Sequence, residues 1–197
     1  DLNGKLLYQF GGNSSITIAT PYAKFGLLFV TSGYVGDRKK PMFAIRPGAT
    51  GDISLESDED KNDYIAWCQR RAGPYNPSTI IYGDLMYVLL DRGLVGCYEA
   101  KTGKHVYGPE RVVPRGGAFT SSPWAYNGKV FFLDENGVTY VLQAGRKFKL
   151  LHANRLNAKD DMCMATPAMG GDKLIIRTDA RVYCFKKAGG SPSIKSQ

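Results

Sequence analysis

The stretch Tyr82–Tyr107, which reads YGDLMYVLLDRGLVGCYEAKTGKHVY, decides the fold. Its run Leu85–Leu90 is apolar at odd and even positions alike. Side chains alternate between the two faces of a strand, so a strand of this composition must be buried on both faces. The turn Asp91–Gly93 leads into a second strand pattern, Leu94–Ala100, and glycine supplies the positive φ that such a hairpin turn needs. The stretch therefore predicts a β-meander that is covered on both sides.

The same order of elements recurs in three further segments, which begin at Ala19, Ser121 and Ala165. A serine or threonine lies at or just before the start of the first strand in every unit. The residues that directly follow these hydroxyl residues are spaced by 58, 44 and 44 positions: Pro21, Thr79, Pro123 and Pro167. The linkers are hairpin-sized, so no helices are available to cover the apolar strands, and neighbouring sheets must do so. Four-stranded units of about 40–50 residues that stack around an axis form a β-propeller. We therefore predict an all-β fold, a β-propeller of four-stranded antiparallel blades with about four blades in this chain.

The blade boundaries follow from the repeat. A single propeller domain is expected over residues 1–188, with blades near 16–72, 75–115, 118–157 and 162–187. In the first unit, the turn Ala49–Gly51 is expected to precede the fourth strand, DISL. The segment 189–197 is rich in Gly, Ser and Pro, and we expect it to be a flexible tail.

The two ends of the chain complement each other in the strand count. The opening DLNGKLLYQF matches the turn and fourth strand of a unit, whereas the last unit stops after its third strand, YCFKKA. In one arrangement, the N-terminal strand within residues 1–12 completes the last blade and closes a ring of four. In the other, the chain is half of a seven- or eight-blade propeller, completed by further sequence or by a second copy in a homodimer. Either form of closure removes an exposed edge strand.

The composition and charge of the chain limit the classes of partner and site that it can have. The formal net charge of +8 favours acidic partners. The basic clusters are scattered, and none has the set of interleaved aromatic residues that forms a base-stacking platform, so we expect no nucleic acid. No apolar run is long enough to span a membrane. The cysteines lack the CxxC spacing of a zinc site, and the sequence leaves open whether Cys97 and Cys184 form a disulfide.

With the repeats laid out, the sequence resembles the PQQ-like, or quinoprotein-type, β-propeller repeat family. It looks especially similar to the BamB-like propeller-repeat proteins of environmental bacteria. The stretches that carry the resemblance cover nearly the whole chain: Ile45–Ser54, Tyr82–Tyr107, Ser121–Gly145 and Ala165–Phe185. The resemblance implies a periplasmic or extracellular location. It also implies a tryptophan at the position in each unit where the fourth strand docks. This chain has Tyr8 and Tyr107 at that position in two units, and Trp67 is the candidate for the tryptophan in another.

Quinoprotein dehydrogenases of the wider superfamily bind PQQ and calcium at the ring centre, through carboxylate and amide ligands. That set cannot be matched here, and the pair Asp160–Asp161 lies on a segment without a calcium-loop pattern. Ser121 is not part of a nucleophile elbow, and His105 and His152 have no evident partner. We therefore expect no catalytic residue, no cofactor and no metal.

The functional prediction is a non-catalytic, extracytoplasmic scaffold that binds a protein or another macromolecule through loops. The candidate partner-binding residues are Tyr34, Asp37, Arg38, Lys39, Lys40 and Trp124, of which Trp124 fits a core position at least as well. Two alternatives remain. One is a PQQ-dependent quinoprotein-like oxidoreductase or a fragment of one, and the other is a protein that binds an acidic polysaccharide.

Overall fold

The chain is an all-β propeller with four blades, described here from a computed structural model over residues 1–157 and 161–186. The first blade contains β2 (Tyr22–Lys24), β3 (Leu27–Thr31), β4 (Met42–Ile45) and β6 (Ile65–Gln69). The second contains β7 (Ile80–Tyr82), β8 (Leu85–Leu90), β9 (Leu94–Glu99) and β10 (His105–Arg111), with the 3₁₀ turn η1 (Asp91–Gly93) between β8 and β9. The third contains β11 (Trp124–Tyr126), β12 (Lys129–Leu133), β13 (Val138–Gln143) and β14 (Leu150–Arg155). The last contains β15 (Ala168–Gly170), β16 (Lys173–Arg177) and β17 (Val182–Lys186).

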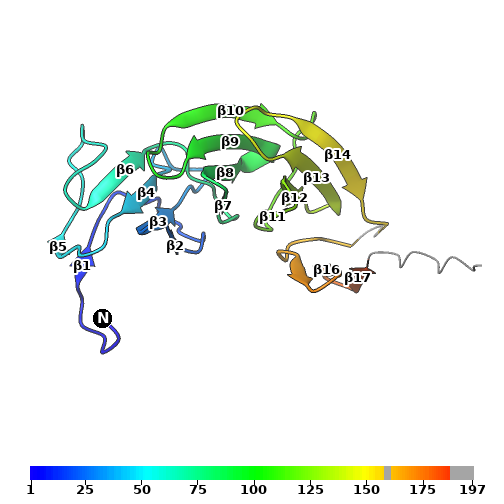
Figure 1. The fold of residues 1–197 in the computed structure, drawn as a ribbon, viewed down its shortest axis with the longest axis horizontal. Helices are drawn as coiled ribbons and strands as arrows, with labels where there is room; N and C mark the ends of the chain where they lie inside the picture. The colour runs from blue at the N-terminus through cyan, green and yellow to red at the C-terminus, as the bar shows by residue number, and fades with distance from the viewer. Residues whose placement is uncertain (158–160, 187–197) are drawn as a thin grey trace, which may run out of the picture.

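The blades follow one another along an open arc rather than a closed ring (Figure 1). The first strands β2, β7 and β11 lie on the concave side, and the fourth strands β6, β10 and β14 lie on the convex side. Within each blade, neighbouring strands pair antiparallel in sequence order. Of the two expected arrangements, a closed ring of four blades and half of a larger ring, the structure therefore displays the second.

Strand β8 shows why the blades must stack. Its side chains Met86 and Val88 pack into one apolar cluster with Phe29 and Met42 of the first blade. Its alternate side chains, Leu85, Tyr87 and Leu89, pack into a second cluster with Val130 and Phe132 of the third blade. The prediction that this strand is buried on both faces is confirmed, and each face is covered by a different neighbouring blade.

A chain of hydrogen bonds joins the blades near the concave side. The backbone N–H of Thr20 donates to Ser78 Oγ, that of Ser78 to Ser122 Oγ, and that of Ser122 to Thr166 Oγ1, each at 2.9 Å. These four residues are the hydroxyl residues that open the four repeats. Their repetition in the sequence therefore reflects a structural contact between successive blades.

The fourth strand of the first blade docks onto the second blade through Trp67, which is buried on β6. Its Nε1–H donates to the carbonyl oxygen of Ala100 at 3.0 Å. Gly103 lies under the indole, and a Cβ added there would meet Trp67 Cδ2 at 2.6 Å. In the second blade, Tyr107 takes the same place and packs edge-on against Phe148 with ring centroids 6.1 Å apart. The Tyr107 hydroxyl is buried without a hydrogen-bond partner in the described parts of the chain.

Two sequence expectations about strand pairing are wrong. The fourth strand of the first blade is β6 and not DISL, because the segment after Gly51 leaves the blade and returns only at Ile65. The N-terminal strand β1 (Tyr8–Gln9) does not complete the last blade, and it pairs in parallel with β5 (Gly51–Asp52) at the other end of the arc. Strand β1 follows the sequence pattern of a fourth strand, but its contacts within the chain lie beside the first blade.

The last blade has three strands within residues 1–157 and 161–186. The tail expected at 189–197 lies outside the described residues, as does Asp160. The open question about the cysteines is settled, since all four are free. Cys97 is buried, whereas Cys184 is exposed in another blade.

The contact between Trp67 and Gly103 can be separated from backbone strain by two glycine substitutions. Gly103 and Gly83 have similar φ values, +69° and +64°, but only Gly103 has an atom within 4 Å of an added Cβ. Replacing Gly83 with alanine is expected to cost about 1 kcal/mol of unfolding free energy, through the left-handed backbone alone. Gly103→Ala adds the clash with Trp67 and is expected to cost about 2 kcal/mol more, measured by urea unfolding. Equal losses at the two sites would contradict this docking contact.

Candidate functional site

The hairpin inserted between β3 and β4 holds most of the predicted site residues. Its base is closed by the hydrogen bond from Ser32 N–H to the Pro41 carbonyl at 3.0 Å, and its tip turns from Tyr34 to Asp37. The Asp37 carboxylate accepts hydrogen bonds from Ser14 Oγ at 2.7 Å, and from the backbone N–H and Oγ of Ser15 at 2.6 and 2.8 Å. Asp37 therefore anchors the hairpin to the segment that precedes β2.

These hydrogen bonds favour the ionised form of Asp37. The bond from the Ser14 hydroxyl is the strongest influence that holds the pKa of the Asp37 carboxyl below its usual value, followed by the bonds from Ser15. The charge of Asp37 is thus satisfied by local donors, and Asp37 positions the hairpin. Its role in partner binding stays a prediction.

The hairpin brings two basic clusters together that are distant in sequence. The backbone N–H of Lys40 donates to the carbonyl of Arg70 at 3.1 Å, and Lys40 forms an isolated bridge with Arg71. Arg38, Lys39, Arg70 and Arg71 consequently lie around one cavity of about 460 Å³. We call it the basic cavity; its remaining lining residues are Gly11, Gly12, Pro41, Phe43, Ser54, Leu55, Ser57 and Cys68.

The basic cavity combines a cationic rim with an apolar floor. Phe43 and Cys68 are buried members of the apolar cluster on the outer face of the first blade. Burial raises the pKa of the Cys68 thiol to about 11, so the thiol is neutral at physiological pH and a poor nucleophile. One guanidinium is fixed in place, because Arg70 donates to the carbonyls of Glu56 and Glu59. This arrangement suits the binding of an anionic group that carries an apolar part.

A second cavity, of about 500 Å³, includes Val35 of the same hairpin in its lining. Its lining includes Val35, Tyr75, Asp91 and Arg92. Burial raises the pKa of the Asp91 carboxyl, while the nearby charges of Lys40 and Arg92 oppose that shift. The inserted hairpin therefore contributes residues both to a cationic cavity and to one of mixed charge.

The predicted site residues play different parts. Arg38 and Lys39 are exposed at the rim of the basic cavity, whereas Lys40 is half-buried and is not part of the cavity lining. Tyr34 packs against Tyr75 with ring centroids 5.3 Å apart, which supports the hairpin. Arg70 and Arg71 were not among the predicted site residues, although their charge cluster is visible in the sequence.

Trp124 is a correction, because it is not available to a partner. Its side chain is buried and stacks on Phe131 with ring centroids 5.3 Å apart. It belongs to the apolar cluster between the third and last blades, together with Leu133 and Ile176. Its position at the start of a first strand places it inside the stack of blades and away from the hairpin.

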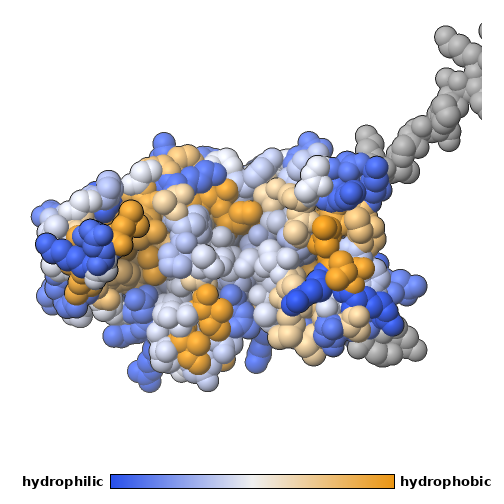
Figure 2. Space-filling view, turned by 90° about the horizontal axis from the view of Figure 1, so that it is seen from below, coloured by the Kyte–Doolittle hydropathy of each residue, from blue (hydrophilic) through white to orange (hydrophobic). Residues whose placement is uncertain are grey.

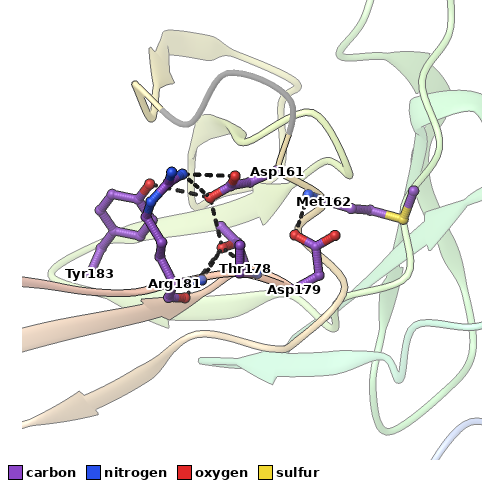
Figure 3. A network of polar contacts seen from close by, with 7 residues as sticks. Asp161, Met162, Thr178, Asp179, Arg181 and Tyr183 are labelled. Atoms are coloured by element: carbon purple, nitrogen blue, oxygen red, sulfur yellow. Dashed lines mark hydrogen bonds and ion pairs between the residues drawn. The ribbon is translucent and has the colours of Figure 1, made fainter.

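The carboxylate of Asp161 is part of a polar network in the last blade (Figure 3). It accepts from Thr178 Oγ1 at 3.0 Å and from Arg181 Nη1 at 2.7 Å, with Tyr183 Oη at 3.4 Å. Partial burial would raise the pKa of Asp161, but these hydrogen bonds and the Arg181 charge outweigh it and lower the pKa. The network ties the segment before β15 to the hairpin between β16 and β17.

Within residues 1–157 and 161–186, no three His, Cys, Asp or Glu side chains are grouped closely enough to share a metal ion. The same ranges contain no helix with the length and apolar character needed to cross a bilayer. Whether the protein uses a cofactor stays a prediction from the sequence.

Comparison with known proteins supports the fold. No protein-family model matches the chain, and no curated protein matches it. Among solved structures, BamB from Moraxella catarrhalis is similar, with a TM-score of 0.56 and 14% identity, over 82% of this chain and 43% of that chain. The computationally designed protein Ika4 is similar with a TM-score of 0.62 and 11% identity, over 93% of this chain and 98% of that one. The designed Ika8 gives a TM-score of 0.61 and 11% identity, over 91% and 48% of the two chains. At these identities the likeness establishes the propeller-like fold, and this chain spans less than half of the BamB chain.

The anchoring of the hairpin predicts a pH effect. The folded-state pKa of Asp37 is depressed, so its contribution to stability is present above the unfolded-state pKa of about 3.9 and is lost as the pH falls through the folded value. Replacing both Ser14 and Ser15 with alanine removes the side-chain donors and is expected to raise the Asp37 pKa toward the unfolded value. NMR titration of the carboxyl carbon measures it, with Asp52, whose pKa is lowered by Ser54, as the internal control. An unchanged Asp37 titration in the double variant would contradict the assignment.

Proposed function

We propose that this protein is a non-catalytic, extracytoplasmic β-propeller scaffold that binds a macromolecular partner at the basic cavity. The partner that fits is a protein segment carrying acidic side chains beside a hydrophobic one. The observation that supports the proposal is the convergence of Arg38, Lys39, Arg70 and Arg71 around a floor that includes Phe43. Cations at a rim steer and orient an acidic segment, and the apolar floor supplies affinity that salt does not screen.

The lining favours binding over chemistry. The cavity contains no carboxylate or histidine, and its cysteine is neutral at physiological pH. General acid–base or nucleophilic catalysis requires such a group within reach of the substrate. The same reasoning keeps the quinoprotein-like oxidoreductase as the alternative. Reduction of a dye by an alcohol or sugar, dependent on added PQQ and calcium, would replace the scaffold proposal with that alternative.

The binding proposal predicts a charge-selective loss of affinity. A fluorescein-labelled peptide of alternating glutamate and leucine serves as the probe, and fluorescence anisotropy measures its Kd. Replacing Arg38 and Arg71 together by glutamine removes two cations from the rim and is expected to raise the Kd about tenfold, since two partly screened contacts are worth roughly 1.4 kcal/mol.

The matched control is the double variant Lys147→Gln and Lys149→Gln, which removes the same charge from exposed positions away from the cavity. It is expected to leave the Kd within about twofold, as loss of net charge alone is screened at physiological salt. Equal losses in the two variants, or no loss in the first, would contradict the site. If heparin binds as tightly as the peptide and dissociates in modest salt, acidic polysaccharide binding is the better function.

A further inference from the structure

Strand β1 lies against the first blade in the position that a fourth strand takes against the blade that follows it. The described parts of the chain contain no other strands of the blade to which β1 would belong. The sequence Gly4–Tyr8 repeats that of Gly103–Tyr107, GKLLY against GKHVY, and both glycines have positive φ, +81° and +69°. Tyr8 packs on the outer face of the first blade near the buried Ala49, much as Trp67 packs on the second blade at Ala100. β1 therefore sits where a blade preceding the first would present its fourth strand.

One edge of β1 is available for pairing. Its hydrogen bonds to the β5 region run from Gly51 N–H to the Leu7 carbonyl, and from Ile53 N–H to the Gln9 carbonyl. Backbone groups of successive residues in a strand point to opposite edges. The N–H and carbonyl of Tyr8, between these two residues, are thus directed to the other edge, where the described parts of the chain place no strand.

The last blade lacks a fourth strand among the described residues, and the repeat indicates in which register such a strand would pair with β17. In the second blade, Cys97 pairs with Tyr87 on one side and with Tyr107 on the other. In the last blade, Cys184 pairs with Ile175 in the equivalent position, and β17 has no fourth strand among the described residues. The residue that belongs opposite Cys184 is the equivalent of Tyr107, which is Tyr8.

We propose that β1 of one copy of this chain completes the last blade of a second copy, so that two chains close one eight-blade ring with two equivalent seams. The two ends of the arc cannot meet in one chain, because β1 and β17 lie at its opposite ends (Figure 1). A second copy supplies to each end what that end lacks. An isologous assembly of this kind closes and leaves no free edge strand.

The surfaces at the two ends fit this arrangement. Seen from below the arc, hydrophobic side chains are exposed toward both of its ends, with smaller hydrophobic groups between them on a surface of mostly intermediate hydropathy (Figure 2). In the proposed register, Leu6 meets Phe185, as His105 meets Tyr98 in the second blade with ring centroids 5.3 Å apart. Leu6 and Phe185 are 71% and 44% exposed in the single chain. Their pairing across the seam removes both from water.

The hydroxyl contacts between blades extend across the same seam. Each opening residue donates its N–H to the hydroxyl of the next blade, and the series ends at Thr166. No acceptor for the Thr166 N–H is found in the described ranges, and Thr20, which begins the series, has its hydroxyl exposed at the first blade. In the ring, the Thr166 N–H of one copy donates to Thr20 Oγ1 of the other.

The first test is the mass of the unmodified protein in solution, by light scattering and native mass spectrometry at micromolar concentration. The expected result is twice 21.6 kDa. A monomer that persists at about 100 µM would overturn the proposal, and would favour a single-chain ring in which further sequence supplies the missing strands. A trimer or an open-ended series of oligomers would overturn it equally.

The second test fixes the register. Directly opposed residues of antiparallel strands have Cα atoms about 4.5–5.5 Å apart, within the range for a disulfide. Under a mild oxidant, Tyr8→Cys is expected to cross-link to Cys184 of the other copy, giving a covalent dimer on a non-reducing gel. Gln9→Cys points to the opposite face and is the matched control, and adding Cys184→Ser must abolish the product. Cross-linking by both variants alike, or by neither while the protein is a dimer, would overturn the register.

This inference rests on strand pairing and not on the proposed function, and the two fail separately. The Arg38 and Arg71 variants should alter peptide binding without altering the mass. Deleting residues 1–10 should convert the dimer to a monomer, and circular dichroism then shows whether the blades remain folded.

Discussion

The structure depends on one constraint, which is that the central strands of each blade are apolar on both faces. In β8, the residues Met86 and Val88 face the first blade, while Tyr87 and Leu89 face the third. A single four-stranded sheet cannot cover both of its own faces, so each blade requires a neighbour on each side. The contacts of Trp67 with Ala100 and the hydroxyl bonds between successive blades then set how those neighbours are aligned. The ends of the arc are where this requirement is not yet met within one chain.

The same end of the first blade carries both functional proposals. Gly11 and Gly12 follow β1 after one intervening residue, Phe10, and line the basic cavity. A second copy bound along β1 would therefore place its last blade beside that cavity. In the two proposals, partner binding and ring closure would then lie next to each other. The cations Arg38 and Lys39 belong to an inserted hairpin, whereas Phe43 and Cys68 of the same cavity belong to the repeated strands β4 and β6.

Much of the fold could be predicted from the sequence, because short local patterns specify its strands and turns and these patterns are repeated. The continuous apolar run in β8, the glycine turns and the hydroxyl residues at the start of each unit predict a four-stranded blade, and the repetition of the unit predicts a propeller.

Prediction failed where a local sequence pattern is compatible with two structures. The turn Ala49–Gly51 looks like the one before β10, but here the chain leaves the blade, and the fourth strand comes only at Ile65. Strand β1 has a fourth-strand sequence, but no local signal says which blade it joins. The basic cavity itself was not predicted, because nothing in the linear sequence brings Arg70 and Arg71 to the hairpin of Arg38. Trp124 stood among the candidate partner residues although the sequence favoured a core position for it, and the structure buries it on β11, a first strand of three residues.

The most direct test of the central claim is a serine scan of four consecutive positions in β8, namely Met86, Tyr87, Val88 and Leu89, with urea unfolding as the measurement. All four side chains are fully buried. Stacking of blades on both faces predicts that each substitution costs about 2–4 kcal/mol of unfolding free energy, with no alternation along the strand. A loss confined to every second position would show that one face of the blade is open to water, and would contradict the account.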